Sequence, residues 1–207
     1  MKNYKLSDEA KTTHWGTVLH RIVATTTFTL ACDITINAGD VGGWIEKESN
    51  LSDNAWVSDE AEVYNQARVS NNALISGNAR VYGNALVYGN ARISGDAQVF
   101  GDALISGNAQ VSDHAKVYGD ADVFGDAEIY DDAKVMNISD YLVFKNNWSS
   151  GRYFTWTKSN DKWTVGCFYG TGDELIKKAY ADSEDSGKHY EAYVKLVETL
   201  KNMEQEK

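Results

Sequence analysis

The residues able to do chemistry are few and widely separated in this sequence. Histidine can ligate zinc or act as a general base, but a catalytic zinc site gathers about three such ligands closely. The two cysteines, Cys32 and Cys167, form no CxxC pair, and neither has a base partner at a motif spacing. We expect both to be reduced, buried thiols. The histidines are scattered at His14, His20, His114 and His189.

One glycine-rich stretch, GCFYGTG at 166–172, precedes an expected helix. Backbone N–H groups at such a place can cradle an anion. The stretch lacks the lysine of a phosphate loop, so we interpret it as a strand-to-helix turn. The sequence therefore predicts no catalytic residue, no metal site and no cofactor.

Carboxylates are the most concentrated chemical groups. Residues 51–134 hold 13 Asp and Glu against 5 Lys and Arg, within a chain of net charge −10. This balance argues against direct nucleic-acid binding, which requires a basic surface. Two readings stay open: a soluble surface, or an acidic rod that competes with nucleic acid for a basic protein. The carboxylates of this candidate partner-binding surface are Asp96, Asp102, Asp113, Asp120, Asp126, Asp131 and Asp132.

A six-residue repeat must position these side chains. Starting at Leu51, fourteen hexads run to Lys134 without insertion; the first residue is always Leu, Val or Ile and the fifth always Ala. In Ala79-Arg80-Val81, the alanine and the valine are two residues apart, so on a strand both point inward. The third and fourth residues, typically Gly and Asn or Asp, suit a corner that needs positive φ. Each hexad is therefore one side of a coil.

Outward residues recur every eighteen positions, which predicts three sides to each coil. Stacked parallel strands lie ~4.8 Å apart, so like side chains would form ladders. The predicted aromatic ladder is Tyr64, Tyr82, Phe100 and Tyr118, and a second apolar patch is Leu86, Tyr88, Leu104 and Phe124. Monomers rarely leave such patches bare, so we expect a homodimer that uses one of these two surfaces.

The two ends depart from the repeat. Residues 1–44 contain alternating strands, such as 18–23, and are expected to form a β cap on a β-helix that spans 45–135. Residues 136–207 are predicted to be a small α+β domain. Its elements are a hairpin of 152–158 and 162–169, a helix after the capping box Thr171–Glu174, and a helix from about Gly187. That last helix carries an apolar stripe: Tyr190, Tyr193, Val194, Val197, Leu200 and Met203. The domain is rich in aromatic residues, which include Trp148, Trp156 and Trp163, and most of them are expected in its core.

The hexad resembles that of hexapeptide-repeat proteins. This resemblance implies a mostly β fold: a triangular left-handed parallel β-helix of about five 18-residue coils, with an N-terminal β cap and a C-terminal α+β domain. More closely, YKLSDEAK at 4–11, VLHRIVATTTF at 18–28 and the GDVGGW motif within 38–61 resemble the opening of YdcK-like proteins. The resemblance covers roughly residues 1–135, and many such relatives are carried by phages and prophages.

Three functions remain open. The first is a non-enzymatic, protein-binding solenoid, borne by a phage or prophage, that inhibits or remodels a host protein such as a defence factor. Its partner would have a basic surface, and no direct nucleic-acid or membrane binding is expected. The second is an acyltransferase, although the hexads leave no loop for a pocket and contain only His114, which we interpret as a surface corner residue. The third is a structural accessory module. The N-terminus lacks the apolar run of a signal peptide, which predicts a cytoplasmic location.

Overall fold

The computed structural model describes residues 2–31 and 33–205, so Cys32 lies outside the described residues. The chain forms two compact units that divide after Asp140. The first contains the N-terminal strands and the repeat, and the second contains a small sheet with two helices.

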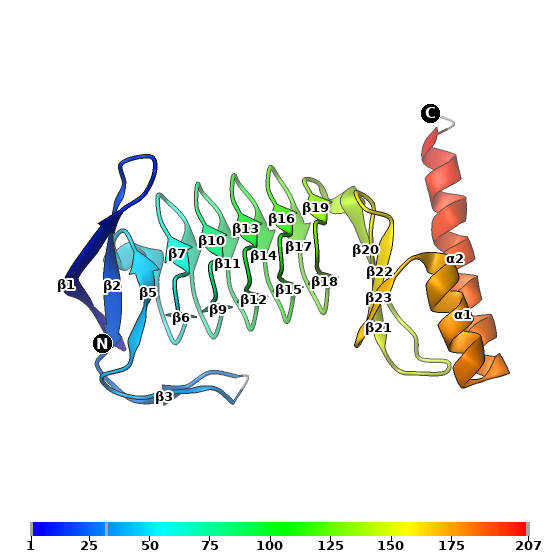
Figure 1. The fold of residues 1–207 in the computed structure, drawn as a ribbon, viewed down its shortest axis with the longest axis horizontal. Coiled ribbons are helices and arrows are strands. Elements are labelled where there is room, and N and C mark those ends of the chain that lie inside the picture. The colour runs from blue at the N-terminus through cyan, green and yellow to red at the C-terminus, as the bar shows by residue number, and fades with distance from the viewer. Residues whose placement is uncertain (1, 32, 206–207) are drawn as a thin grey trace. The chain divides into compact units, whose positions relative to one another are not determined.

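The repeat forms a parallel β-solenoid of about five coils, as the sequence predicts (Figure 1). Each repeat strand pairs in parallel with a strand eighteen residues before or after it, for example Arg80 with Gln98 and Val81 with Val99. The strands are β6 Trp56–Val57, β7 Glu62–Val63, β8 Arg68–Val69, β9 Leu74–Ile75, β10 Arg80–Val81, β11 Leu86–Val87, β12 Arg92–Ile93, β13 Gln98–Val99, β14 Leu104–Ile105, β15 Gln110–Val111, β16 Lys116–Val117, β17 Asp122–Val123, β18 Glu128–Ile129 and β19 Lys134–Val135.

These strands make three flat sheets, one on each side of the coil. The first face contains β7, β10, β13, β16 and β19; the second contains β8, β11, β14 and β17; the third contains β6, β9, β12, β15 and β18. The aliphatic and alanine residues of every hexad point into the coil, and the alanines are at most 3 % exposed. The interior is therefore the narrow aliphatic stack that the invariant alanine predicts.

The corners have the backbone that the sequence requires. The third residue of all fourteen hexads has positive φ, whether it is Gly, as at Gly107 (φ 70°), or Asn or Asp, as at Asn71 (φ 59°). A side-chain oxygen at this place also accepts a backbone N–H of the next coil: Asn71 Oδ1 lies 3.3 Å from Gly89 N, and Asp113 Oδ2 lies 3.2 Å from Asp131 N. Asn and Asp thus hold neighbouring coils together where they replace glycine.

The N-terminal strands extend the first face of the solenoid. β1 (Tyr4–Thr12) and β2 (Val18–Ala24) pair antiparallel, β5 (Val41–Ile45) joins β2, and β5 then pairs in parallel with β7. The GDVGGW motif has a steric reason, because a Cβ on Gly42 would lie 2.6 Å from Val57 O and one on Gly43 would lie 2.7 Å from Ala61 O. A two-stranded hairpin, β3 (Phe28–Thr29) with β4 (Thr35–Ile36), and a short 3-10 helix, η1 (Glu48–Asn50), complete this region.

The C-terminal unit follows a 3-10 helix, η2 (Ile138–Asp140). It is an antiparallel sheet of β20 (Tyr141–Lys145), β21 (Tyr153–Thr157), β22 (Lys162–Val165) and β23 (Phe168–Gly170), with helices α1 (Gly172–Asp182) and α2 (Glu184–Gln205). The capping box at Thr171 and Glu174 is confirmed. The core includes Phe154, Trp156, Trp163, Leu175, Tyr190, Val194 and Val197.

Several expectations for this unit are wrong. Residues 162–169 form two strands instead of one, because the chain turns at Gly166 (φ 58°). This turn also leaves Cys167 exposed, although we expected a buried thiol. Trp156 and Trp163 lie in the core, as expected for most of the aromatic residues, whereas Trp148 is 76 % exposed. The distal end of the α2 stripe is open, with Met203 57 % exposed.

Candidate protein-binding surface

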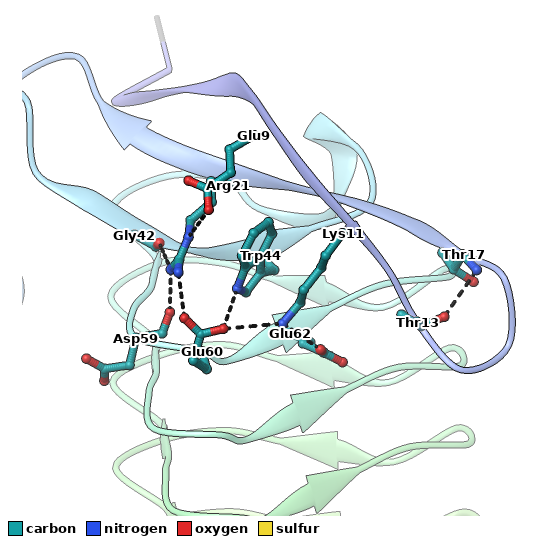
Figure 2. A network of polar contacts seen from close by, with 10 residues as sticks. All are labelled: Glu9, Lys11, Thr13, Thr17, Arg21, Gly42, Trp44, Asp59, Glu60 and Glu62. Atoms are coloured by element: carbon teal, nitrogen blue, oxygen red, sulfur yellow. Dashed lines mark hydrogen bonds and ion pairs between the residues drawn. The ribbon is translucent and has the colours of Figure 1, made fainter.

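A polar network closes the N-terminal end of the first face (Figure 2). The indole N–H of Trp44 on β5 donates to Glu60 Oε2 at 2.9 Å, and Arg21 Nη2 on β2 lies 2.5 Å from Glu60 Oε1. Lys11 Nζ on β1 lies 2.8 Å from Glu62 Oε1. The Arg21 and Lys11 cations are also 4.3 and 4.5 Å from the Trp44 ring centroid, within cation–π range. Four strands distant in sequence are thereby joined.

The network fixes the charge of Glu60. The hydrogen bond from Trp44, together with the charges of Arg21 and Lys11, holds the pKa of Glu60 below its ordinary value. Glu60 is therefore an anion at neutral pH. The side chain of Glu60 lines one side of a groove on the first face.

This groove has a volume of about 580 Å³ along the first face. The outward residues of β10, β13 and β16, namely Arg80, Gln98 and Lys116, form its floor. Its remaining lining residues are Lys11, Glu60, Glu62, Asn78, Asp96 and His114. Arg80 is exposed and Lys116 is half-buried at the outward positions of β10 and β16.

His114 lies at the edge of this groove. It is 72 % exposed at a corner, and its Nδ1 is 3.5 Å from Asp96 Oδ2. The interpretation of His114 as a surface corner residue is confirmed. Its proximity to Asp96 follows from their separation by eighteen residues, one coil.

The predicted aromatic ladder is present on the first face. The rings of Tyr64, Tyr82, Phe100 and Tyr118 stack with centroids 5.0–5.1 Å apart and planes within 7°. Each ring face is covered by the neighbouring ring of the stack. Leu19 and Trp44 also pack against Tyr64. Burial raises the pKa of Tyr64 to about 12. The ladder is therefore mostly an internal stabilising element, with half-buried edges.

The second apolar patch lies on the second face. Leu86 and Leu104 are neighbours on β11 and β14 and are paired in register. Leu86, Tyr88 and Phe124 are 41, 38 and 49 % exposed, and Leu104 is half-buried. This patch is more open than the aromatic ladder.

The structure distributes the seven predicted carboxylates over three corners. Asp96, Asp113, Asp131 and Asp132 lie between the third and first faces, Asp102 and Asp120 between the first and second, and Asp126 between the second and third. They form one acidic edge and two smaller groups instead of a single patch. Burial, with the neighbouring Asp126, also raises the pKa of Glu128.

Three of these carboxylates are held by amides of the preceding coil. Asn78 Nδ2 donates to Asp96 Oδ1 at 3.0 Å, Asn84 to Asp102 at 2.9 Å, and Asn108 to Asp126 at 3.0 Å. Asn90 and Asn108 make the same contact without a charge, also at 3.0 Å. This contact between side chains of neighbouring coils, here called a rung, therefore has the same length whether the accepting side chain is a neutral Asn or a negatively charged Asp.

Sequence reasoning missed the groove and its N-terminal wall. Arg80 and Lys116 are two coils apart on one face. The eighteen-residue period was therefore sufficient to predict that these two cations lie on the same face. The roles of Lys11, Arg21 and Trp44 carried no such signal, because their contacts join separate strands.

Parallel strands that repeat every eighteen residues around three flat faces define a hexapeptide β-solenoid protein. The family model described as the YdcK β-solenoid repeat matches residues 73–88, 79–95 and 97–113. The repeats are therefore of the YdcK type, which supports the YdcK-like family and the left-handed β-helix that the resemblance implied. A search of curated proteins finds no match.

Two further findings concern the described residues. No helix among them has the length and apolar character needed to cross a membrane. Within residues 2–31 and 33–205, no three or more His, Cys, Asp or Glu side chains are placed to hold a metal ion.

Proposed function

We propose that this protein is a non-enzymatic binding scaffold whose acidic corners engage a basic protein surface. The observation that carries the proposal is the series of Asn-to-Asp rungs. The amides of Asn78, Asn84 and Asn108 orient exposed carboxylates at fixed positions on a rigid solenoid.

Such an array suits recognition by charge. Where one corner carries carboxylates on successive coils, as at Asp102 and Asp120, they are ~4.8 Å apart along the solenoid, comparable with the ~3.4 Å axial rise per phosphate of one DNA strand. Both spacings are shorter than the ~8 Å screening length at physiological ionic strength. A partner with a basic surface would therefore experience a negative field along these acidic corners, which accelerates association. Nucleic acid would compete for that partner.

The biological setting is part of the same proposal. The YdcK-like resemblance favours a phage or prophage accessory protein that acts in the host cytoplasm. There it would inhibit or remodel a host protein, including a defence factor. The exposure of His114, the only histidine of the hexads, and the continuity of the coils support binding over acyl transfer.

The test is affinity capture from a bacterial lysate at low salt with the wild-type chain and an Asp96→Asn/Asp102→Asn/Asp126→Asn variant. The Asn90–Asn108 rung indicates that asparagine preserves the corner geometry. We expect wild type to capture a protein that the variant does not retain, and DNA to elute it.

The matched control is Asp8→Asn/Asp33→Asn/Asp182→Asn, which removes the same charge from exposed residues outside the repeat. It should capture the same protein as wild type. Capture that is equal for both triple variants, or that DNA does not reverse, would refute the role of the corners.

A further inference from the structure

We propose that the groove on the first face binds an extended, uncharged oligosaccharide that lies along the solenoid axis. The groove has a volume of about 580 Å³, which is within the ordinary range of ligand sites. It crosses four successive coils, and the outward strand residues that line it are Glu62, Arg80, Gln98 and Lys116. The proposal is independent of the proposed function, because its tests change the floor of the groove and leave the acidic corners unchanged.

The charges of the groove balance, although the chain as a whole carries −10 with histidine counted as neutral. The described lining contains three cations and three carboxylates: Lys11, Arg80 and Lys116 with Glu60, Glu62 and Asp96. Its other residues are Asn78, Gln98 and His114. A polyanion would be repelled by the carboxylates and a polycation by the cations, so a ligand without net charge fits best.

The lining combines groups that only donate hydrogen bonds with groups that only accept them. Arginine and lysine side chains are donors only, ionised carboxylates are acceptors only, and the amides of Asn78 and Gln98 do both. A hydroxyl group donates one hydrogen bond and accepts others. Neighbouring hydroxyls of a sugar can therefore satisfy a donor such as Arg80 and an acceptor such as Asp96, which lie on adjacent coils.

The spacing of the coils favours a sugar chain over a peptide. Polar side chains recur in the groove at each coil, ~4.8 Å apart. One pyranose ring of an extended glycan chain has nearly this length, so successive rings would meet successive coils. An extended peptide rises ~3.3 Å per residue, or ~6.6 Å between side chains on one side. A peptide would therefore lose its register with the coils.

Two carboxylates of the groove are oriented before a ligand binds. Glu60 Oε2 accepts the indole N–H of Trp44 at 2.9 Å (Figure 2), and Asp96 Oδ1 accepts Asn78 Nδ2 at 3.0 Å. A carboxylate can accept about four hydrogen bonds, and the side chains of Glu60 and Asp96 are 53 and 52 % exposed. These contacts thus orient both groups within their capacity to bind a ligand, which reduces the ordering cost of binding.

The third face shows that the repeat alone does not produce this lining. The corresponding groove there has a volume of about 220 Å³. Its described lining has one cation, Arg92, four amide side chains and no carboxylate. The larger volume and the balanced charges therefore distinguish the first face.

The polar lining also sets the strength of binding. Each hydrogen bond to the ligand replaces one to water, so its net contribution is small. The nine described lining residues are all polar and add little burial of apolar surface. We therefore expect a dissociation constant on the order of 0.1–1 mM.

Heteronuclear NMR titration of the full chain with maltohexaose, cellohexaose and N-acetylated chitohexaose tests the proposal. At least one of these glycans should shift the amide resonances of β10, β13 and β16. Arg80→Ala should raise its dissociation constant about tenfold, because a hydrogen bond to a charged group is lost. Arg68→Ala is the matched control, since Arg68 is also an exposed arginine before a valine, but on the second face. It should leave the dissociation constant unchanged.

Two further probes separate the other ligand classes. A galacturonic acid hexamer carries the charge that the proposal disfavours, and a hexaserine peptide with blocked ends carries hydroxyls on a peptide backbone. Both should bind more weakly than the best neutral glycan. Equal or tighter binding of either probe would overturn the proposal, in favour of an anion site or a peptide site. So would the absence of shifts in the groove with all three glycans at about 10 mM, ten times the weakest expected dissociation constant. Equal weakening by Arg80→Ala and Arg68→Ala would overturn it as well.

Discussion

Two glycines on the same corner allow the energetic cost of coil stacking to be isolated. Gly107 and Gly125 are one coil apart and have the same φ of 70°. A Cβ on Gly107 would lie 2.9 Å from both the N and the O of Gly125, whereas a Cβ on Gly125 would meet no described atom within 4 Å. The same O of Gly125 accepts the N–H of Asn108 at 2.7 Å, so it cannot move away without disturbing the pairing of the coils.

The magnitudes follow from these contacts. Alanine at left-handed φ costs roughly 1–2 kcal/mol at either site, and overpacking adds about 1–3 kcal/mol at Gly107 alone. Gly107→Ala should therefore unfold with about 1–3 kcal/mol less free energy than Gly125→Ala. The gain from a less flexible unfolded chain is common to both variants and cancels.

Chemical denaturation followed by far-UV circular dichroism measures this difference. A third variant, Gly107→Asn, should lose less than Gly107→Ala, because Asn71 on the same corner has φ of 59° and accepts an N–H of the next coil. Equal losses for Gly107→Ala and Gly125→Ala would refute the contact argument and leave backbone conformation as the only reason for glycine.

Two other predictions concern the interior and the tyrosines. Ala91→Leu should destabilise the solenoid by about 1–3 kcal/mol, because Ala91 is fully buried, whereas Arg92→Leu at the exposed neighbour should stay within about 0.5 kcal/mol; equal melting temperatures would contradict the inward assignment. Burial raises the pKa of Tyr64 and of Tyr130 to about 12, above the unfolded value of about 10. Their stabilising contribution is complete below pH 10 and should be lost as the pH rises to about 12. Denaturation across this range should show that Tyr64→Phe and Tyr130→Phe each reduce the alkaline loss.

The coils were predictable because each constraint is local or repeats at a fixed separation. A two-residue strand with a buried aliphatic and a corner of positive φ is complete within one hexad. The eighteen-residue period then fixes which hexads are neighbours, so the Tyr64–Tyr82 stack follows from sequence alone. The same reasoning places Asp96 beside His114.

The groove was not predictable, since it depends on a hairpin from another part of the chain. Lys11 and Arg21 flank Trp44 only because β1 and β2 extend the first face. Some predictions for the C-terminal unit were wrong for a related reason. Residue type alone suggested that Cys167 is buried and did not distinguish the exposed Trp148 from the buried tryptophans, because both positions depend on turns, at Gly166 and at 146–152.

The repeat separates the residues that fold the chain from those that can recognise a partner. The aliphatic, alanine and corner positions are fixed by packing, and they are almost the same on all three sides. The two outward positions of each hexad face no such constraint, yet each face differs: an aromatic ladder on the first, leucines with alternating serines and rings on the second, and mainly serines in the corresponding column of the third. Since packing does not require these differences, the outward columns are where specificity for a second copy or for a partner can be encoded.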